Sequence, residues 1–290
     1  MNSKLKLWTQ LGLGTALAGG LLAACGGEAG GEGAAGEAGG ESAAVAGEGE
    51  GGAGAGEGTG GEAAGDGTAG GEGEGGVAVG NAASDPVAYG IALAVAEAHV
   101  VAARDAFAAG KKDAAAEMFA HPVSEVLVEM DPVFAKLGVK DFKPLLTDAS
   151  VAVADGKSAA EVNKQYDGII AALRGAAAKA PKSDAADGAI ATDIIADQIE
   201  RASTMYRTAA KDDRYEPYLD GYGFYKVAEA SFARSGAAIK AANPDAHARI
   251  TEALALLKQA YPAATRPAKL PVEQGALSAA SSKVMLAAGT

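Results

Sequence analysis

The sequence has few residues of several kinds, and each shortage narrows what the chain can be. Cys25 is the only cysteine in 290 residues, so no disulfide can form within the chain and the region after it has no cysteine nucleophile. The chain also lacks a Gly-x-Ser-x-Gly turn, a phosphate-binding loop, a His-Glu-x-x-His zinc motif and a Cys-x-x-Cys-His haem motif. Because the usual signals of catalysis are missing, a protein without enzymatic activity is favoured.

Positive charge is scarce as well, and it is unevenly placed. The chain carries a net charge of −12. Residues 26–80 hold ten Glu, one Asp and no Lys or Arg. The rest of the chain is therefore close to neutral and has no basic stretch, so the sequence predicts no binding to nucleic acid.

What is present at the N-terminus has the three parts of a secretory signal over residues 1–24. Lys4 and Lys6 give a positive start, residues 11–22 are apolar and uncharged, and small residues precede Cys25. The apolar part is too short for a mature membrane span, which needs roughly 20 residues. We therefore expect residues 1–24 to be removed.

The residues Leu-Ala-Ala-Cys ending at Cys25 resemble the lipobox of bacterial lipoproteins. The resemblance implies that Cys25 is acylated, that the chain is cut just before it, and that the membrane is a partner of the protein through this residue. Gly26, rather than Asp, follows the cysteine, which favours the outer membrane facing the periplasm. The alternative is a chance cysteine within a signal rich in small residues.

A low-complexity segment of Gly, Ala and Glu follows Cys25. It has almost no large apolar side chains, so it cannot bury enough surface to offset the entropy cost of ordering. We expect residues 25–84 to form an acylated, disordered tether between the membrane and a folded domain.

The composition changes near Ser84, and the remaining residues, 85–290, are rich in Ala with apolar residues at helical spacing. The alternating β-branched runs of strands are missing. Ser84-Asp85-Pro86 is typical of a helix start. We expect an all-α antiparallel helical bundle. The expected helices are 86–109, 112–121, 123–130, a short turn at 131–132, 141–153, 158–180, 187–210, 214–235, 244–260 and 272–288.

The bundle contains a weak internal repeat. AFAAGKKDAAAEMF at residues 106–119 aligns with YRTAAKDDRYEPYL at residues 206–219. We interpret this as two related helical halves, residues 85–183 and 184–290. The alternative is that Ala-rich helices resemble one another through composition alone.

Two of the three histidines are placed to meet. His99 and His121 are equally distant in sequence from Gly110, the expected turn, so in an antiparallel hairpin they lie at the same level. Glu125 follows His121 by one helical turn and can share its face. Two imidazoles and a carboxylate are suitable ligands for iron, zinc or copper. His99, His121 and Glu125 therefore form a predicted transition-metal site.

Other residues complicate this site. Glu97 or Glu129 is available as a further oxygen ligand, whereas Pro122 interrupts the helix between His121 and Glu125. The alternative is that His121 caps a helix end and His99 is a hydrogen-bonded core residue. His247 is expected at the surface in the first turn of a helix.

A second candidate site lies in YEPYLDGYGFY, where five aromatic residues fall within eleven positions. Tyrosine phenolates bind ferric iron and aromatic faces stack on flat ligands, so Tyr222 and Tyr225, with Glu229, form a candidate ligand site. Gly221 and Gly223 allow another backbone or a ligand to come close. The alternative is core packing with the hydroxyl groups reaching the surface.

The stretch GYGFYKVAEASF resembles the helix motif of imelysin-like extracytoplasmic proteins, in which Gly, an aromatic residue, His and Glu are closely spaced. Gly223, Phe224 and Glu229 correspond to this pattern, although Glu229 lies one residue further along than the family's Glu and Tyr225 and Lys226 stand where that family has its His. The resemblance implies an all-helical, duplicated lipoprotein linked to iron uptake.

Together these features predict a lipid-anchored cell-envelope protein that binds iron or another transition metal without catalysing a reaction. Two alternatives remain open. One is an envelope interaction or scaffold domain without a ligand. The other is a helical metallohydrolase, which needs the same metal with an open coordination position.

Overall fold

The computed structural model describes residues 77–211 and 213–289, and the regular structure of these residues is entirely helical. The predicted all-α bundle is confirmed. The predicted signal, Cys25 and the tether up to residue 76 lie outside the described residues. The elements are α2 (Pro86–Ala108), α3 (Lys112–Pro122), the π-helix η1 (Val123–Leu127), α4 (Asp131–Leu137), α5 (Lys143–Ala154), α6 (Ala159–Ala177), α7 (Asp187–Lys211), α8 (Glu216–Ala242), α9 (Pro244–Ala260) and α10 (Gln274–Ala288).

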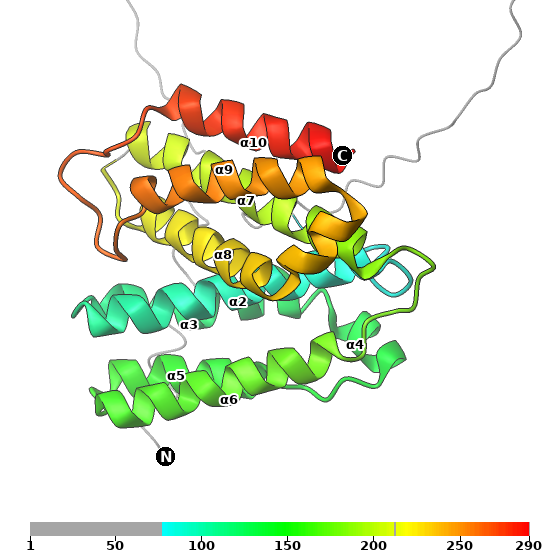
Figure 1. Ribbon diagram of the computed structural model, residues 1–290. Helices are drawn as coiled ribbons and strands as arrows, with labels where there is room; N and C mark the ends of the chain where they lie inside the picture. The colour runs from blue at the N-terminus through cyan, green and yellow to red at the C-terminus, as the bar shows by residue number, and fades with distance from the viewer. Residues whose placement is uncertain (1–76, 212, 290) are drawn as a thin grey trace, which may run out of the picture. The chain divides into compact units, whose positions relative to one another are not determined.

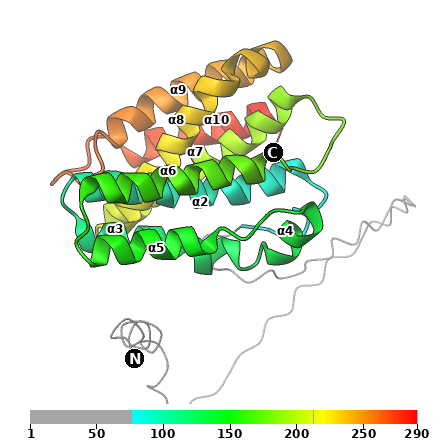
Figure 2. The same ribbon diagram turned by 90° about the horizontal axis from the view of Figure 1, so that it is seen from below.

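Helix α2 is the centre of the bundle, and the long helices run side by side around it (Figures 1 and 2). It contacts α3, α6, α7 and α8. Every residue from 92 to 103 is buried, so α2 is covered on all sides, as expected for a helix that is apolar all round. By length and composition α2 is also the one helix of the described region able to cross a membrane. Its burial among the other helices is typical of a core helix.

Local signals set several helix boundaries where the sequence predicted them. The Asp85 carboxylate accepts a hydrogen bond from the Val87 N–H at 2.8 Å and caps α2, with Pro86 in the first turn. Gly110 has a positive φ of 77° in the turn that reverses the chain into α3. Asn243 caps α9, which has the predicted bounds.

Several helix ends differ from the prediction by one to three residues, and three segments differ more substantially. Helix α8 continues past the expected end at residue 235, because Ile239 is fully buried and packing against α9 keeps the chain helical beyond Gly236. The segment 123–130 is not one helix, because η1 replaces its first part and the chain then turns. The expected short turn at 131–132 extends into α4, which ends at Leu137 and is capped by Gly138 in the left-handed region.

Tyrosine side chains contribute several of the largest buried side chains of the core, although the aromatic content of the chain is low. Tyr89, Tyr206, Tyr218 and Tyr261 are among the largest fully buried side chains. Each hydroxyl is hydrogen-bonded to a backbone carbonyl, at distances of 2.7–3.0 Å. Full burial of these phenols is therefore achieved without leaving a polar atom unpaired.

One hydrophobic cluster includes residues from both predicted halves. Helix α2 of the first half packs on α7 and α8 of the second. The relation between the halves by duplication stays a prediction. Ala82 is fully buried in the same cluster, so the packed region begins before residue 85, inside the segment expected to be tether.

Candidate metal site

His99 lies in the middle of α2 and is almost completely buried. Its Nδ1 is 2.9 Å from the Val95 carbonyl oxygen one turn earlier in the same helix. That carbonyl can only accept a hydrogen bond, so Nδ1 carries a proton and Nε2 faces away from the helix backbone. The ring also makes an edge contact with Phe224 of α8, at 5.8 Å between ring centroids.

The α2–α3 hairpin places His121 beside His99, with ring centroids 5.8 Å apart. Glu125 lies between the two rings: its Oε2 is 3.2 Å from Nε2 of His99, and its Oε1 is 3.5 Å from Nδ1 of His121. Pro122 does not separate His121 from Glu125, because the π-helical turn η1 carries the chain on in a wider spiral. One donor atom from each of the three residues lies within 4.8 Å of the other two.

Helix α8 adds two carboxylates to this group that the sequence analysis missed. Oδ1 of Asp220 is 3.6 Å from Nε2 of His99, and Oε1 of Glu216 is 4.0 Å from Nε2 of His121. Oδ1 of Asp220 is buried and makes no hydrogen bond within the described chain. The i, i+4 spacing of Glu216 and Asp220 could have indicated that both carboxylates lie on one face of a helix, since such pairs share a face.

A cavity of about 270 Å³ borders these groups. His99, Glu125, Glu216 and Asp220 are part of its lining, together with Phe224. The side chains of His121 and Glu125 are 23% and 17% exposed, so a small ion can reach the donor atoms from solvent.

The electrostatics of the group are dominated by His99. Burial alone lowers the pKa of its imidazole, but the hydrogen bond to Glu125 and the charges of Asp220 and Glu125 outweigh burial and raise that pKa to about 9. Burial raises the pKa of Glu125, yet its bond to His99 and the charges of both histidines hold it below the usual value. Burial raises the pKa of Asp220 to about 6. At neutral pH His99 is therefore an imidazolium between two carboxylates.

The expectation that Glu97 supplies an additional ligand is wrong. Both of its carboxylate oxygens accept hydrogen bonds from the Arg174 guanidinium of α6, one of them at 2.6 Å. The physical reason is helical geometry, since residues two apart in a helix do not share a face.

Two other residues considered in the sequence analysis lie outside the group. Glu129 is exposed and does not belong to it, and His247 lies in the first turn of α9 against Phe232.

Tyr222 and Tyr225 do not converge on a common point. The Tyr222 hydroxyl donates to Oδ2 of Asp105 at 2.7 Å, and the Tyr225 hydroxyl donates to Oε1 of Glu229 at 2.7 Å. Both residues are buried, and burial raises the pKa of both phenols. This is the arrangement of core tyrosines with paired hydroxyl groups, and loss of a proton to form a phenolate ligand is disfavoured.

Comparison of the chain with protein-family models, with curated proteins and with solved structures found no match. The resemblances to bacterial lipoproteins and to imelysin-like proteins stay predictions. What the chain binds has to be inferred from its own side chains.

Proposed function

We propose that this chain is a lipid-anchored cell-envelope protein whose helical domain binds a transition metal ion through His99, His121 and Glu125. The observation that supports the proposal most directly is the convergence of one donor atom from each residue within 4.8 Å. These donors come from three elements of the fold, and the group borders a cavity that solvent can enter.

The distances suit a shared ion. Ligand bonds of about 2 Å in a tetrahedral site place neighbouring donors roughly 3.3 Å apart. The separation of 3.2 Å between Nε2 of His99 and Oε2 of Glu125 is close to this value, and the other carboxylate oxygen, Oε1, lies 3.5 Å from Nδ1 of His121. Asp220, whose buried Oδ1 makes no hydrogen bond and lies 3.6 Å from Nε2 of His99, is the natural fourth ligand. The Nδ1 bond of His99 to a carbonyl is the support that metal-bound histidines usually have.

The donor set favours some metals over others. Two imidazoles with carboxylates suit zinc and ferrous iron, whereas Cu(I) prefers thiolate or thioether ligands, which this group does not have. A binding role is favoured over a metallohydrolase, because Asp220 is near enough to occupy the position that a reacting water would need.

Metal analysis of the chain from residue 26 onward tests the binding role. After dialysis against Zn²⁺ or Fe²⁺ under reducing conditions, we expect one equivalent of metal per chain. His121→Ala removes a partly exposed ligand and should abolish this stoichiometric binding. His247→Ala is the matched control and should retain it. Equal metal content in the parent and His121→Ala proteins would favour the alternative of a ligand-free scaffold domain.

The membrane part of the proposal is tested separately. Acylation and cleavage at Cys25 predict a mass increase on a new N-terminal cysteine and recovery of the protein in the outer membrane. Cys25→Ala should abolish both. An unmodified thiol on an uncleaved chain would refute the anchor and leave the metal site unaffected.

A further inference from the structure

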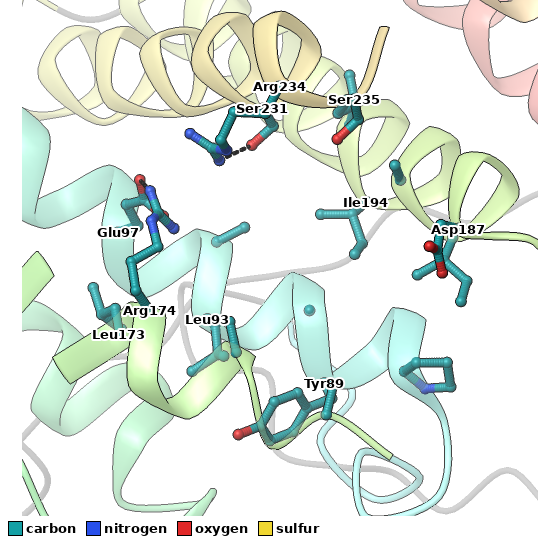
Figure 3. Close-up of a pocket in the computed structure, with 18 of the residues that line it drawn as sticks. Tyr89, Leu93, Glu97, Leu173, Arg174, Asp187, Ile194, Ser231, Arg234 and Ser235 are labelled. Atoms are coloured by element: carbon teal, nitrogen blue, oxygen red, sulfur yellow. Dashed lines mark hydrogen bonds and ion pairs between the residues drawn. The ribbon is translucent and has the colours of Figure 1, made fainter. Parts of the chain in front are cut away.

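A second cavity, larger than the one at the histidines, is separate from them. It has a volume of about 570 Å³ and lies between α2, α6, α7 and α8 (Figure 3). Leu93, Leu173 and Ile194 provide apolar walls from three different helices. The absence of a side chain at Gly90 leaves room for the side chain of Ile194, because a Cβ there would lie 2.3 Å from Cδ1 of Ile194. Small-molecule sites in proteins typically occupy about 300–1,000 Å³ and are mostly apolar.

The polar groups of this cavity are unevenly distributed. Arg174 and Glu97 form their ion pair on one side, and Asp187 lies on the other (Figure 3). Arg234 of α8 faces the cavity next to the ion pair and hydrogen-bonds to Oγ of Ser231 at 2.9 Å. Unlike Arg174, it forms no ion pair with a carboxylate of the described chain.

The charge near Arg234 is therefore not balanced by the protein. Arg234 is exposed at the edge of the cavity, and its partial burial and the nearby positive charge of Arg174 lower the pKa of its guanidinium, with Glu97 opposing. Two guanidinium groups thus lie near one carboxylate, and Lys182 and Asp187 of the same lining offset each other, which leaves one positive charge at the edge of an apolar cavity. A single bound anion would neutralise it, whereas a dianion would leave an excess of negative charge.

We propose that this cavity binds a small amphiphile with a monocarboxylate head and a hydrocarbon body, the chemistry of a medium-chain fatty acid. The planar guanidinium of Arg234 and the hydroxyl of Ser231 would hold the carboxylate, since Arg donates two parallel hydrogen bonds to such a group. The hydrocarbon would displace water from the walls formed by Leu93, Leu173 and Ile194. The site does not depend on the metal site and goes beyond it.

Calorimetric titration of the chain from residue 26 onward with decanoate, below its micelle concentration, tests the proposal. Decanoate should bind saturably at one site per chain. Decanol has the same tail without the charge, acetate has the head without the tail, and decyl phosphate has a head of higher charge. We expect each of the three to bind at least about tenfold more weakly than decanoate.

Two variants assign the binding to this cavity. Arg234→Gln should weaken decanoate binding by about tenfold or more, whereas Arg249→Gln, which changes an arginine of α9 outside the cavity, should leave it unchanged. Ala191→Trp places a large ring in the lining and should abolish binding, with helicity and melting temperature confirming that both proteins fold. The His121→Ala protein should bind decanoate normally. Loss of metal binding can therefore be distinguished from loss of decanoate binding.

Three results would overturn the proposal. They are no saturable decanoate binding, decanol or decyl phosphate binding as tightly as decanoate, and equal affinity in the Arg234→Gln and parent proteins.

Discussion

Gly223 of α8 lies directly against the backbone of Ala98 in α2. A Cβ added to Gly223 would stand 2.4 Å from the Ala98 carbonyl oxygen, far inside van der Waals contact. Ala98 precedes His99, and Asp220 lies three residues before Gly223 on α8. This close approach of two helices therefore determines how near Asp220 comes to His99, and it explains the glycine in the aromatic stretch.

Gly223→Ala should push α2 and α8 apart and lower the free energy of unfolding by about 1–3 kcal/mol. The backbone of Ala98 cannot move aside as a flexible side chain would. Gly236→Ala on the same helix is the control, because its Cβ would meet no atom closer than 3.8 Å. This control should be neutral or stabilising by up to about 1 kcal/mol. Urea unfolding of both variants measures the difference, and equal stabilities would show that the contact is not tight.

The metal-free protein should lose stability at alkaline pH because of His99. The pKa of His99 is about 9 in the folded chain, against an ordinary 6.5. Its contribution is therefore fully present below about pH 6.5 and is lost as the pH rises through 9. The loss is on the order of 3 kcal/mol.

Urea unfolding between pH 6 and 10 measures this loss, with chelator present to exclude metal. His99→Gln should be less stable at neutral pH and should show a flatter profile above pH 7. A parent profile as flat as that of the variant would mean that His99 is not held as an imidazolium.

The arrangement of His99 and His121 was predictable because it depends on local geometry. A single turn at Gly110 joins α2 to α3, and equal spacing on either side of it places the two rings at one level. Glu125 followed from one helical turn of spacing, although the turn is π-helical rather than α-helical.

The contribution of α8 was not predictable in the same way. Asp220 reaches His99 only because α8 packs on α2 in one register, and that register depends on the contact of Gly223 with Ala98. No local pattern encodes a contact between residues so far apart in sequence. The error at Glu97 is different, because the two-residue spacing from His99 already places Glu97 on another face of the helix, and only its pairing with Arg174 of α6 was beyond local prediction.

Asp220→Asn should lower the pKa of His99, because the negative charge of Asp220 is one of the causes that raise it. The alkaline loss of stability in the metal-free protein should therefore begin at a lower pH. Glu216→Gln is the matched control, since Glu216 lies near His121 rather than His99. Titration of the His99 ring by NMR measures the shift directly. A shift of equal size in both variants would contradict the specific pairing of Asp220 with His99.

Metal binding should strengthen as the pH rises toward 9. An ion bound to Nε2 of His99 has to displace the proton that this nitrogen carries at neutral pH. We expect the Kd for Zn²⁺ to fall about tenfold for each pH unit between 6.5 and 8.5, with one proton released per ion. Calorimetry in buffers of different ionisation enthalpy counts that proton. His247→Ala should show the same slope, because His247 lies outside the group. Binding that is independent of pH, without proton release, would place the metal elsewhere and leave His99 as the centre of a salt-bridge network alone.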